Sequence, residues 1–236
     1  WVLENGLGTL EDCDIYGNAL SGVEIKTGGN PTIGRCQIHD GNKSGVLVWE
    51  KGQGTIEDCD IASNAYPGVT IKTGGNPTIR RCQIHDGNKS GVYVLENGTG
   101  LIQDCDIASN AKAGVRIKKG GHPTIRRCQI HSGKQSGVWV LENGRGTLED
   151  CDIYGNAVSG VAIKTGGNPL IRRCKIHDGK ANGVHVYEKG QGTIEDCDIA
   201  SNAKAGVRIK TSGNPTIGRC RINRNGHHAV WVSDQG

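Results

Sequence analysis

Ten cysteines recur along the chain at a constant spacing of 23 residues. Other columns keep the same period. The second residue after each cysteine is always Ile, and a Val-x-Ile or Val-x-Val triplet begins ten residues after each cysteine. A self-similar period of roughly 20 to 50 residues predicts a solenoid, in which each repeat forms one coil of a stack. The cysteines are Cys13, Cys36, Cys59, Cys82, Cys105, Cys128, Cys151, Cys174, Cys197 and Cys220.

Within each repeat, residues alternate between two faces over Cys-x-Ile and Val-x-Ile/Val, which is typical of strands. These short segments are bounded by Gly, Asn and Pro, and no stretch has a helical period. We therefore predict an all-β fold, a parallel β-helix of about ten 23-residue coils with two or three strands per coil. At roughly 4.8 Å per coil the rod would be about 48 Å long. Stacked Ile, Val and Cys would fill its core, which explains how a chain with 4% aromatic residues can fold.

The repeat predicts a single β-helix domain over residues 1–236. Residues 1–7 form a partial N-terminal coil in this interpretation, 8–220 the regular coils, and 221–236 an irregular C-terminal end. A glycine column that starts at Gly29 never varies. It indicates turns that need either a positive φ or a close approach of two backbones.

A second period of 46 residues organises the coils in pairs, because the residue before each cysteine alternates between Asp and Arg. Stacked neighbours such as Asp58 and Arg81 would attract one another, each contact contributing a few tenths of a kcal/mol to about 1 kcal/mol. The string TIEDCDIAS (55–63) could instead hold catalytic acids, since Asp58 and Asp104 would lie about 9.6 Å apart, near the separation in inverting glycosidases. The intervening arginine favours the structural interpretation, because it neutralises the acid.

Neither the cysteines nor the histidines follow a metal-binding pattern. The cysteines lack CxxC spacing, and their parallel Cβ vectors would suit a disulfide poorly. We expect reduced, buried thiols, which favours a reducing compartment such as the cytoplasm. Histidines such as His39 recur every 46 residues, too far apart to share an ion, and we expect surface contacts with neighbours such as Asp40. No metal or other cofactor is expected.

Composition narrows the classes of partner. The chain has 28 Lys and Arg against 24 Asp and Glu, a net charge of +4 that gives no reason to expect nucleic acid. No run of about 18 apolar residues is present, so no membrane partner is expected.

Specific function in a repeat protein is expected where the repeats differ. Two columns vary most, and the two-residue period of a strand places both on the outer face of one sheet. They form exposed aromatic and aliphatic rungs between Lys and Arg, as contact sites do. The alternative is that Lys stems merely cover these rungs. The candidate binding residues are Trp1, Leu47, Trp49, Tyr93, Leu95, Trp139, Leu141, His185, Tyr187 and Trp231.

The strings NPTIRRCQIHDG, SGVYVLENGTG and IEDCDIASNA resemble the right-handed parallel β-helix repeats of the pectin-lyase-like superfamily. They are most similar to the 23-residue repeat of the CASH-type β-helix domain in F-box ubiquitin-ligase subunits and related bacterial proteins. The resemblance covers the whole chain and implies a right-handed coil. It implies either recruitment of proteins or carbohydrate catalysis, although no catalytic group of a lyase can be matched here. The close agreement between copies is also typical of an engineered or recently duplicated array.

We therefore expect a non-catalytic scaffold that binds a protein partner through the outward Trp/Tyr/Leu–Lys face. Uninterrupted coils, without loops to wall a cleft, argue against an enzyme. The first alternative is binding or processing of an extended glycan, because aromatic rungs every two coils match the repeat of a β-linked disaccharide. An enzyme of this kind would be a polysaccharide lyase or hydrolase. The second alternative is end-to-end self-association through exposed strand edges, as in a designed structural repeat.

Overall fold

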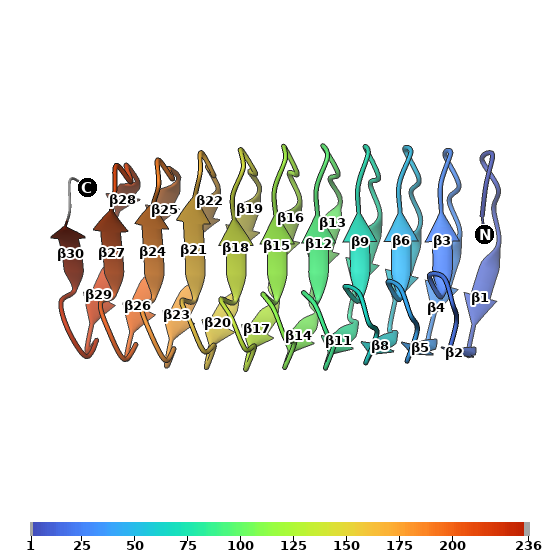
Figure 1. Ribbon diagram of the computed structural model, residues 1–236, viewed down its shortest axis with the longest axis horizontal. Helices are drawn as coiled ribbons and strands as arrows, with labels where there is room; N and C mark the ends of the chain where they lie inside the picture. The colour runs from blue at the N-terminus through green and yellow to red at the C-terminus, as the bar shows by residue number, and fades with distance from the viewer. Residues whose placement is uncertain (1, 234–236) are drawn as a thin grey trace.

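The computed structural model describes residues 2–233, which form a rod of stacked coils with the chain ends at opposite ends of the rod (Figure 1). Each coil contributes one short strand to each of three parallel sheets. We number the coils by their cysteines, so that coil 1 contains Cys13 and coil 10 contains Cys220. No helix is present within residues 2–233. The predicted all-β parallel β-helix is confirmed, with three strands in every coil.

The strands of each sheet follow one another in coil order. The first sheet contains β1 (Thr9–Glu11), β4 (Thr32–Gly34), β7 (Thr55–Glu57), β10 (Thr78–Arg80), β13 (Leu101–Gln103), β16 (Thr124–Arg126), β19 (Thr147–Glu149), β22 (Leu170–Arg172), β25 (Thr193–Glu195) and β28 (Thr216–Gly218). The second contains β2 (Asp14–Tyr16), β5 (Gln37–His39), β8 (Asp60–Ala62), β11 (Gln83–His85), β14 (Asp106–Ala108), β17 (Gln129–His131), β20 (Asp152–Tyr154), β23 (Lys175–His177), β26 (Asp198–Ala200) and β29 (Arg221–Asn223). The third contains β3 (Val23–Ile25), β6 (Val46–Val48), β9 (Val69–Ile71), β12 (Val92–Val94), β15 (Val115–Ile117), β18 (Val138–Val140), β21 (Val161–Lys164), β24 (Val184–Tyr187), β27 (Val207–Lys210) and β30 (Val230–Ser233).

The register of every sheet repeats the 23-residue period of the sequence. Ile33 pairs with Ile56 in the first sheet, and Val46 pairs with Val69 in the third. Identical side chains therefore stack along the rod. The last coil departs from the repeat in sequence at RNGHHA, yet β29 and β30 pair with β26 and β27 in the same register.

Columns of Ile, Val and Cys fill the interior, as the alternation of the strands requires. Ile56 and Val69 are completely buried, and Cys59 is 2% exposed. The Cys59 thiol lies within hydrogen-bonding distance of the carbonyl oxygens of Glu57 (3.2 Å) and, in the coil before, Ile33 (3.6 Å). All ten cysteines are free thiols, in agreement with the expected reduced state.

The turns are held by a buried asparagine and by close backbone contacts. The Asn64 side chain donates to the carbonyl oxygens of Ile38 (3.0 Å) and Ala62 (2.9 Å), and its Oδ1 accepts from the Gly41 amide (3.0 Å). The invariant glycine column allows two backbones to approach closely. A Cβ on Gly52 would lie only 2.6 Å from the carbonyl oxygen of Ile25 in the preceding coil. The other expectation for this column, a positive φ, is not met at Gly52.

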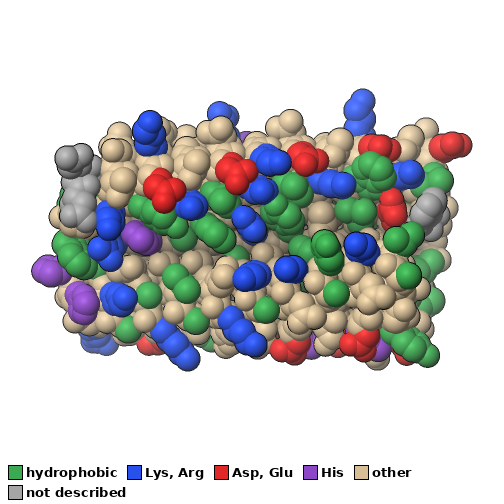
Figure 2. All heavy atoms as spheres, viewed as in Figure 1, with side chains coloured by type: hydrophobic (Ala, Val, Ile, Leu, Met, Phe, Trp, Pro, Cys, Tyr) green, Lys and Arg blue, Asp and Glu red, His purple; other side chains and the backbone are tan. Residues whose placement is uncertain are grey.

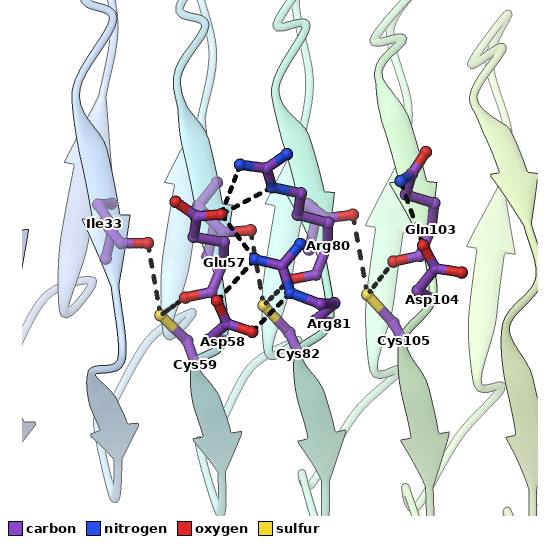
Figure 3. Close-up of polar contacts among 12 residues, drawn as sticks. Ile33, Glu57, Asp58, Cys59, Arg80, Arg81, Cys82, Gln103, Asp104 and Cys105 are labelled. Atoms are coloured by element: carbon purple, nitrogen blue, oxygen red, sulfur yellow. Dashed lines mark hydrogen bonds and ion pairs between the residues drawn. The ribbon is translucent and has the colours of Figure 1, made fainter.

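Salt bridges join the coils in doublets, each an odd-numbered coil and the even-numbered coil after it. Asp58 accepts two hydrogen bonds from Arg81, both of 2.7 Å, and Glu57 accepts one of 2.7 Å from Arg80 (Figure 3). The same Asp–Arg pair recurs in all five doublets. Among the residues described, one salt bridge between coils crosses from one doublet to the next, that of Arg126 with Glu149 (3.2 Å). The predicted alternation of Asp and Arg is confirmed. Each Asp, however, pairs with the Arg of the following coil and not with the Arg of the coil before it.

Within residues 2–233 the structure offers no helical segment with the length and apolarity that a bilayer crossing requires.

A candidate binding groove on the third sheet

The outer face of the third sheet carries two side-chain columns that differ from coil to coil. The middle residue of each strand points outward because the residues on both sides of it fill the core. We call these middle residues the first outward column, and the residues two positions later the second outward column. The first column comprises Glu24, Leu47, Thr70, Tyr93, Arg116, Trp139, Ala162, His185, Arg208 and Trp231. The second comprises Lys26, Trp49, Lys72, Leu95, Lys118, Leu141, Lys164, Tyr187, Lys210 and Ser233.

A groove with a volume of about 850 Å³ runs over this face from coil 1 to coil 6. Figure 2, which views the face, shows hydrophobic side chains along the rod flanked by basic and acidic ones. A smaller residue, Thr70, lines the groove between Leu47 and Tyr93, its neighbours in the sheet. Thr70 is 8% exposed, and its hydroxyl hydrogen-bonds to that of Ser44 at 2.8 Å.

The groove is basic. Five cationic side chains line it, against two carboxylates. Both carboxylates have neighbours: Glu24 accepts from the indole N–H of Trp49 (2.9 Å), and Glu96 accepts from the hydroxyl of Thr73 (3.1 Å). The field in the groove therefore favours a ligand that carries negative charge. The cations are Lys43, Lys72, Lys89, Lys112 and Arg116.

Aromatic rings and cations alternate along the groove and beyond it. The ammonium groups of Lys26 and Lys72 lie 5.0 and 4.9 Å from the centre of the Trp49 ring. The guanidinium of Arg116 lies between two rings, 5.5 Å from Tyr93 and 4.8 Å from Trp139. Such contacts hold the rings and the cations in place, each contributing roughly 0.5 to 1 kcal/mol at exposed sites.

The same alternation continues in coils 7 to 10. Lys164 lies 5.8 Å from Trp139 and 5.6 Å from Tyr187, and Arg208 lies 4.4 Å from Trp231. His185 stacks on Tyr187 with ring centres 4.4 Å apart. Burial, and then the positive charge of Arg208, lower the pKa of His185 to about 4, so this imidazole is neutral at pH 7.

The structure places the predicted binding residues unevenly. Four of the ten line the groove: Leu47, Tyr93, Leu95 and Trp139. The five others within the described residues lie on the same face outside it, namely Trp49, Leu141, His185, Tyr187 and Trp231. Trp1 lies outside the described residues.

The expected exposure of the rungs is wrong for two of them. Leu95 and Leu141 are buried, at 9% and 4% exposure, whereas the aromatic rungs are half-buried. The chain turns back directly after each leucine, with the Gly98 amide donating to the Leu95 carbonyl at 2.9 Å. The same turn follows Trp49 and Tyr187, whose larger side chains are half-buried at the equivalent positions.

One rim of the groove was not predicted. It is built by the residue three positions before each third-sheet strand, including Lys43, Tyr66, Lys89 and Lys112. The Lys43 ammonium lies 4.7 Å from the centre of the Tyr66 ring. This column also varies between repeats, so its variability was the available signal.

The aspartates that directly follow the first-sheet strands form no acid pair. Asp58 forms a salt bridge with Arg81, and Asp104 forms one with Arg127, each at 2.7 Å. Hydrogen bonds from these arginines hold the pKa of both aspartates below its usual value. A general acid needs a raised pKa, so these groups are unsuited to that role.

Three of the four histidines at the ends of second-sheet strands, His39, His85 and His177, bridge carboxylates of two coils, and His131 contacts Asp106 and the Ser132 hydroxyl instead. The Nδ1 and Nε2 atoms of His85 lie 2.7 Å from Asp86 and 2.8 Å from Asp60. The contact with the following aspartate was predicted, and His39 and His177 repeat it. No group of three or more potential metal ligands occurs within the described part of the chain.

Comparison with known proteins places this geometry in a family. A family model described as the right-handed β-helix region matches residues 1–122 and 113–236. The A-module of mannuronan C-5 epimerase AlgE6 from Azotobacter vinelandii superposes with a TM-score of 0.72 at 16% identity, covering 96% of this chain and 71% of that one. A variant of the periplasmic alginate epimerase AlgG has a TM-score of 0.67 at 12% identity, covering 98% and 75%.

Pectate lyase Pel9A is more distant, with a TM-score of 0.55 at 12% identity, covering 88% of this chain and 69% of that one. No curated protein matches the sequence. At these identities the solved structures establish a shared architecture, as the predicted pectin-lyase-like resemblance requires. The chain belongs to the right-handed β-helix family.

Proposed function

We propose that this protein binds an extended polysaccharide along the groove of the third sheet. One observation carries the proposal: Tyr93 and Trp139 stand two coils apart on the groove floor with Arg116 held between them. Two coils span about 9.6 Å, close to the length of a disaccharide in an extended chain. Successive disaccharides could therefore meet equivalent rings.

The chemistry of the groove suits sugars. Aromatic rings offer large rigid apolar faces against which the apolar face of a sugar can pack. Around them, Ser90, Lys89, Lys112 and Gln135 offer hydroxyl, ammonium and amide groups to sugar hydroxyls. A long shallow groove of this kind fits a linear polymer that lies parallel to the rod.

The structural neighbours favour a glycan over a protein partner. Their names say that they act on mannuronan, alginate and pectate, which are polysaccharides. The protein partner that we first expected stays a prediction, and nothing in the groove favours it. We propose binding without turnover, because every coil keeps the 23-residue repeat and no inserted loop walls the groove into a cleft.

Isothermal titration with oligosaccharides of defined length tests the proposal. We expect Tyr93→Ala and Trp139→Ala each to weaken binding roughly tenfold, as loss of an interface anchor does. Tyr16→Ala is the matched control, because Tyr16 is 63% exposed on the second sheet, outside the groove. Circular dichroism would establish that the variants fold. Binding that survives both groove substitutions, or that is lost equally in Tyr16→Ala, would contradict the proposal.

A further inference from the structure

The last doublet departs from the other four on the second sheet. In the earlier even-numbered coils, the two outward strand positions and the turn residue after them hold Gln or Lys, then His, then Asp or Ser. Coil 10 holds Arg221, Asn223 and Arg224 at these positions. The backbone keeps its register near the C-terminal end of the rod, because Arg221 pairs with Asp198 and Asn223 with Ala200 (Figure 1). The departure therefore concerns the side chains.

These changes replace an internally paired cluster by polar groups that lack partners. In coil 4 the His85 imidazole lies between Asp60 and Asp86, so the ring and the two carboxylates satisfy one another. In coil 10 a shorter amide, Asn223, takes the place of the ring, and Arg224 takes the place of the second carboxylate. Among the residues described, Arg224 forms no salt bridge, and the side-chain amide of Asn223 forms no hydrogen bond. Both side chains are therefore available to a ligand.

A pocket with a volume of about 450 Å³ lies at this position. Its polar lining consists of both arginines, the Ser201 hydroxyl, the Asn223 amide and one carboxylate, that of Asp198. Arg221 already donates to this carboxylate through Nε (3.3 Å) and Nη2 (2.5 Å). Two arginines against one aspartate leave one positive charge, which the guanidinium of Arg224 carries. The pocket is therefore suited to an anion.

We propose that this pocket, which is separate from the groove of the third sheet, binds a phosphate group, either as the free ion or as the phosphoryl group of a phosphomonoester. The planar fork of an arginine donates two parallel hydrogen bonds to a phosphate. Arg224 supplies this fork, while Ser201 and Asn223 offer a hydroxyl and an amide to the remaining oxygens. A carboxylate has only two oxygens, which Arg224 alone would satisfy, so the additional donors favour phosphate.

An NMR titration of the isotope-labelled protein with sodium phosphate, at constant ionic strength, tests the site. We expect saturable shifts confined to the amides of coils 9 and 10, with a dissociation constant on the order of 1 mM, as for a few charge-assisted hydrogen bonds at an exposed site. Acetate should bind roughly tenfold more weakly, because it leaves donors unused. Equal affinity for acetate would overturn the choice of phosphate.

Glucose 6-phosphate distinguishes the two sources of the phosphate group. Binding at least as tight as that of inorganic phosphate assigns the pocket to a phosphomonoester, whereas weaker binding assigns it to the free ion. The arginines could instead serve only to keep the exposed edge of the last coil charged. In that case phosphate would produce no saturable shift, and the proposal would fall.

Three variants and a control test the residues themselves. Arg224→Asp, which restores the residue of coils 2, 4 and 8, should abolish the shifts, and Arg224→Lys should retain part of the affinity. Arg145→Gln removes an equal charge from an exposed turn outside the pocket and should change nothing. The triple variant Gln83→Arg/His85→Asn/Asp86→Arg transfers the coil-10 residues to coil 4, beside the same Asp-x-Ala-Ser sequence in coil 3, and should create a second site there.

Melting curves would establish that each variant folds. Unchanged binding in Arg224→Asp, or a folded triple variant that gains no second site, would overturn the assignment of the pocket.

Discussion

Serine substitution of two equivalent glycines should destabilise the rod by different amounts. After the third-sheet strands of odd-numbered coils the chain adopts a left-handed conformation, with φ of 73° at Gly74 and 75° at Gly120. Side chains cost about 1 kcal/mol or more in this conformation. We therefore expect Gly74→Ser to lower the free energy of unfolding by about 1 kcal/mol, since nothing else lies closer than 3.9 Å to the new Cβ.

Gly120→Ser should cost more, because of the residue beneath it. A Cβ on Gly120 would lie 2.3 Å from Oδ1 of Asn97, whereas the residue beneath Gly74 is Lys51, whose chain leaves room. Moving Asn97 off its rotamer adds roughly 0.5 to 1.5 kcal/mol, for a total of about 2 kcal/mol. The chain already holds a natural precedent: Ser212, at φ 59°, occupies this position above Lys189.

Urea unfolding followed by tryptophan fluorescence would measure the order of stabilities. The double variant Asn97→Lys/Gly120→Ser should return to the level of Gly74→Ser, because it removes the clash and keeps the strain. Ser212→Gly should stabilise the protein by up to about 1 kcal/mol. Equal losses for Gly74→Ser and Gly120→Ser, or a loss for Ser212→Gly, would refute this reasoning.

Three further predictions concern the turns, the histidines and the thiols. Asn110→Ala should destabilise by roughly 3 kcal/mol in urea unfolding, because it removes three buried hydrogen bonds, to the carbonyls of Ile84 and Ala108 and from the Gly87 amide. Asn18→Ala, at an exposed position in coil 1, should cost much less. Hydrogen bonds to Asp40 and Asp14 raise the pKa of His39 above 6.5. The stabilisation is complete below the unfolded-state pKa and is lost as pH rises through the folded-state pKa, so the melting temperature should fall above neutral pH, less steeply in His39→Gln. An unchanged profile in His39→Gln would contradict this. A thiol reagent followed by mass spectrometry should modify Cys13 and Cys220 before the eight buried cysteines, and uniform labelling would indicate that the native rod opens throughout.

The register of the fold could be predicted from the sequence because one residue column becomes one stack. Cys59 above Cys36, and Asp58 beside Arg81, follow from the 23-residue spacing alone. The sequence also places Tyr93 and Trp139 on the outside, since a strand alternates its two faces. Which residues stack on one another, and on which face of a strand they lie, can therefore be predicted from the sequence alone.

The depth of each position could not be predicted in this way. Leu95 is buried and Trp49 half-buried in the same column, although the same hydrogen bond closes the turn after each of them, so the size of the side chain and not the alternation of the strand accounts for the difference. The basic rim at Lys89 and Lys112 comes from a turn, whose direction is not contained in any two-residue pattern. The sequence also does not tell whether each Asp pairs with the Arg of the following coil or of the preceding one, because alternating signs allow both.

That direction has a practical consequence for changing the length of the rod. Because Asp58 reaches forward to Arg81 and not back to Arg35, the seams between doublets are crossed by few charges. Shortening or extending the protein should succeed in steps of 46 residues cut at these seams. A step of 23 would leave an odd coil whose acids have no basic neighbour, so the natural building block of this rod is two turns of chain.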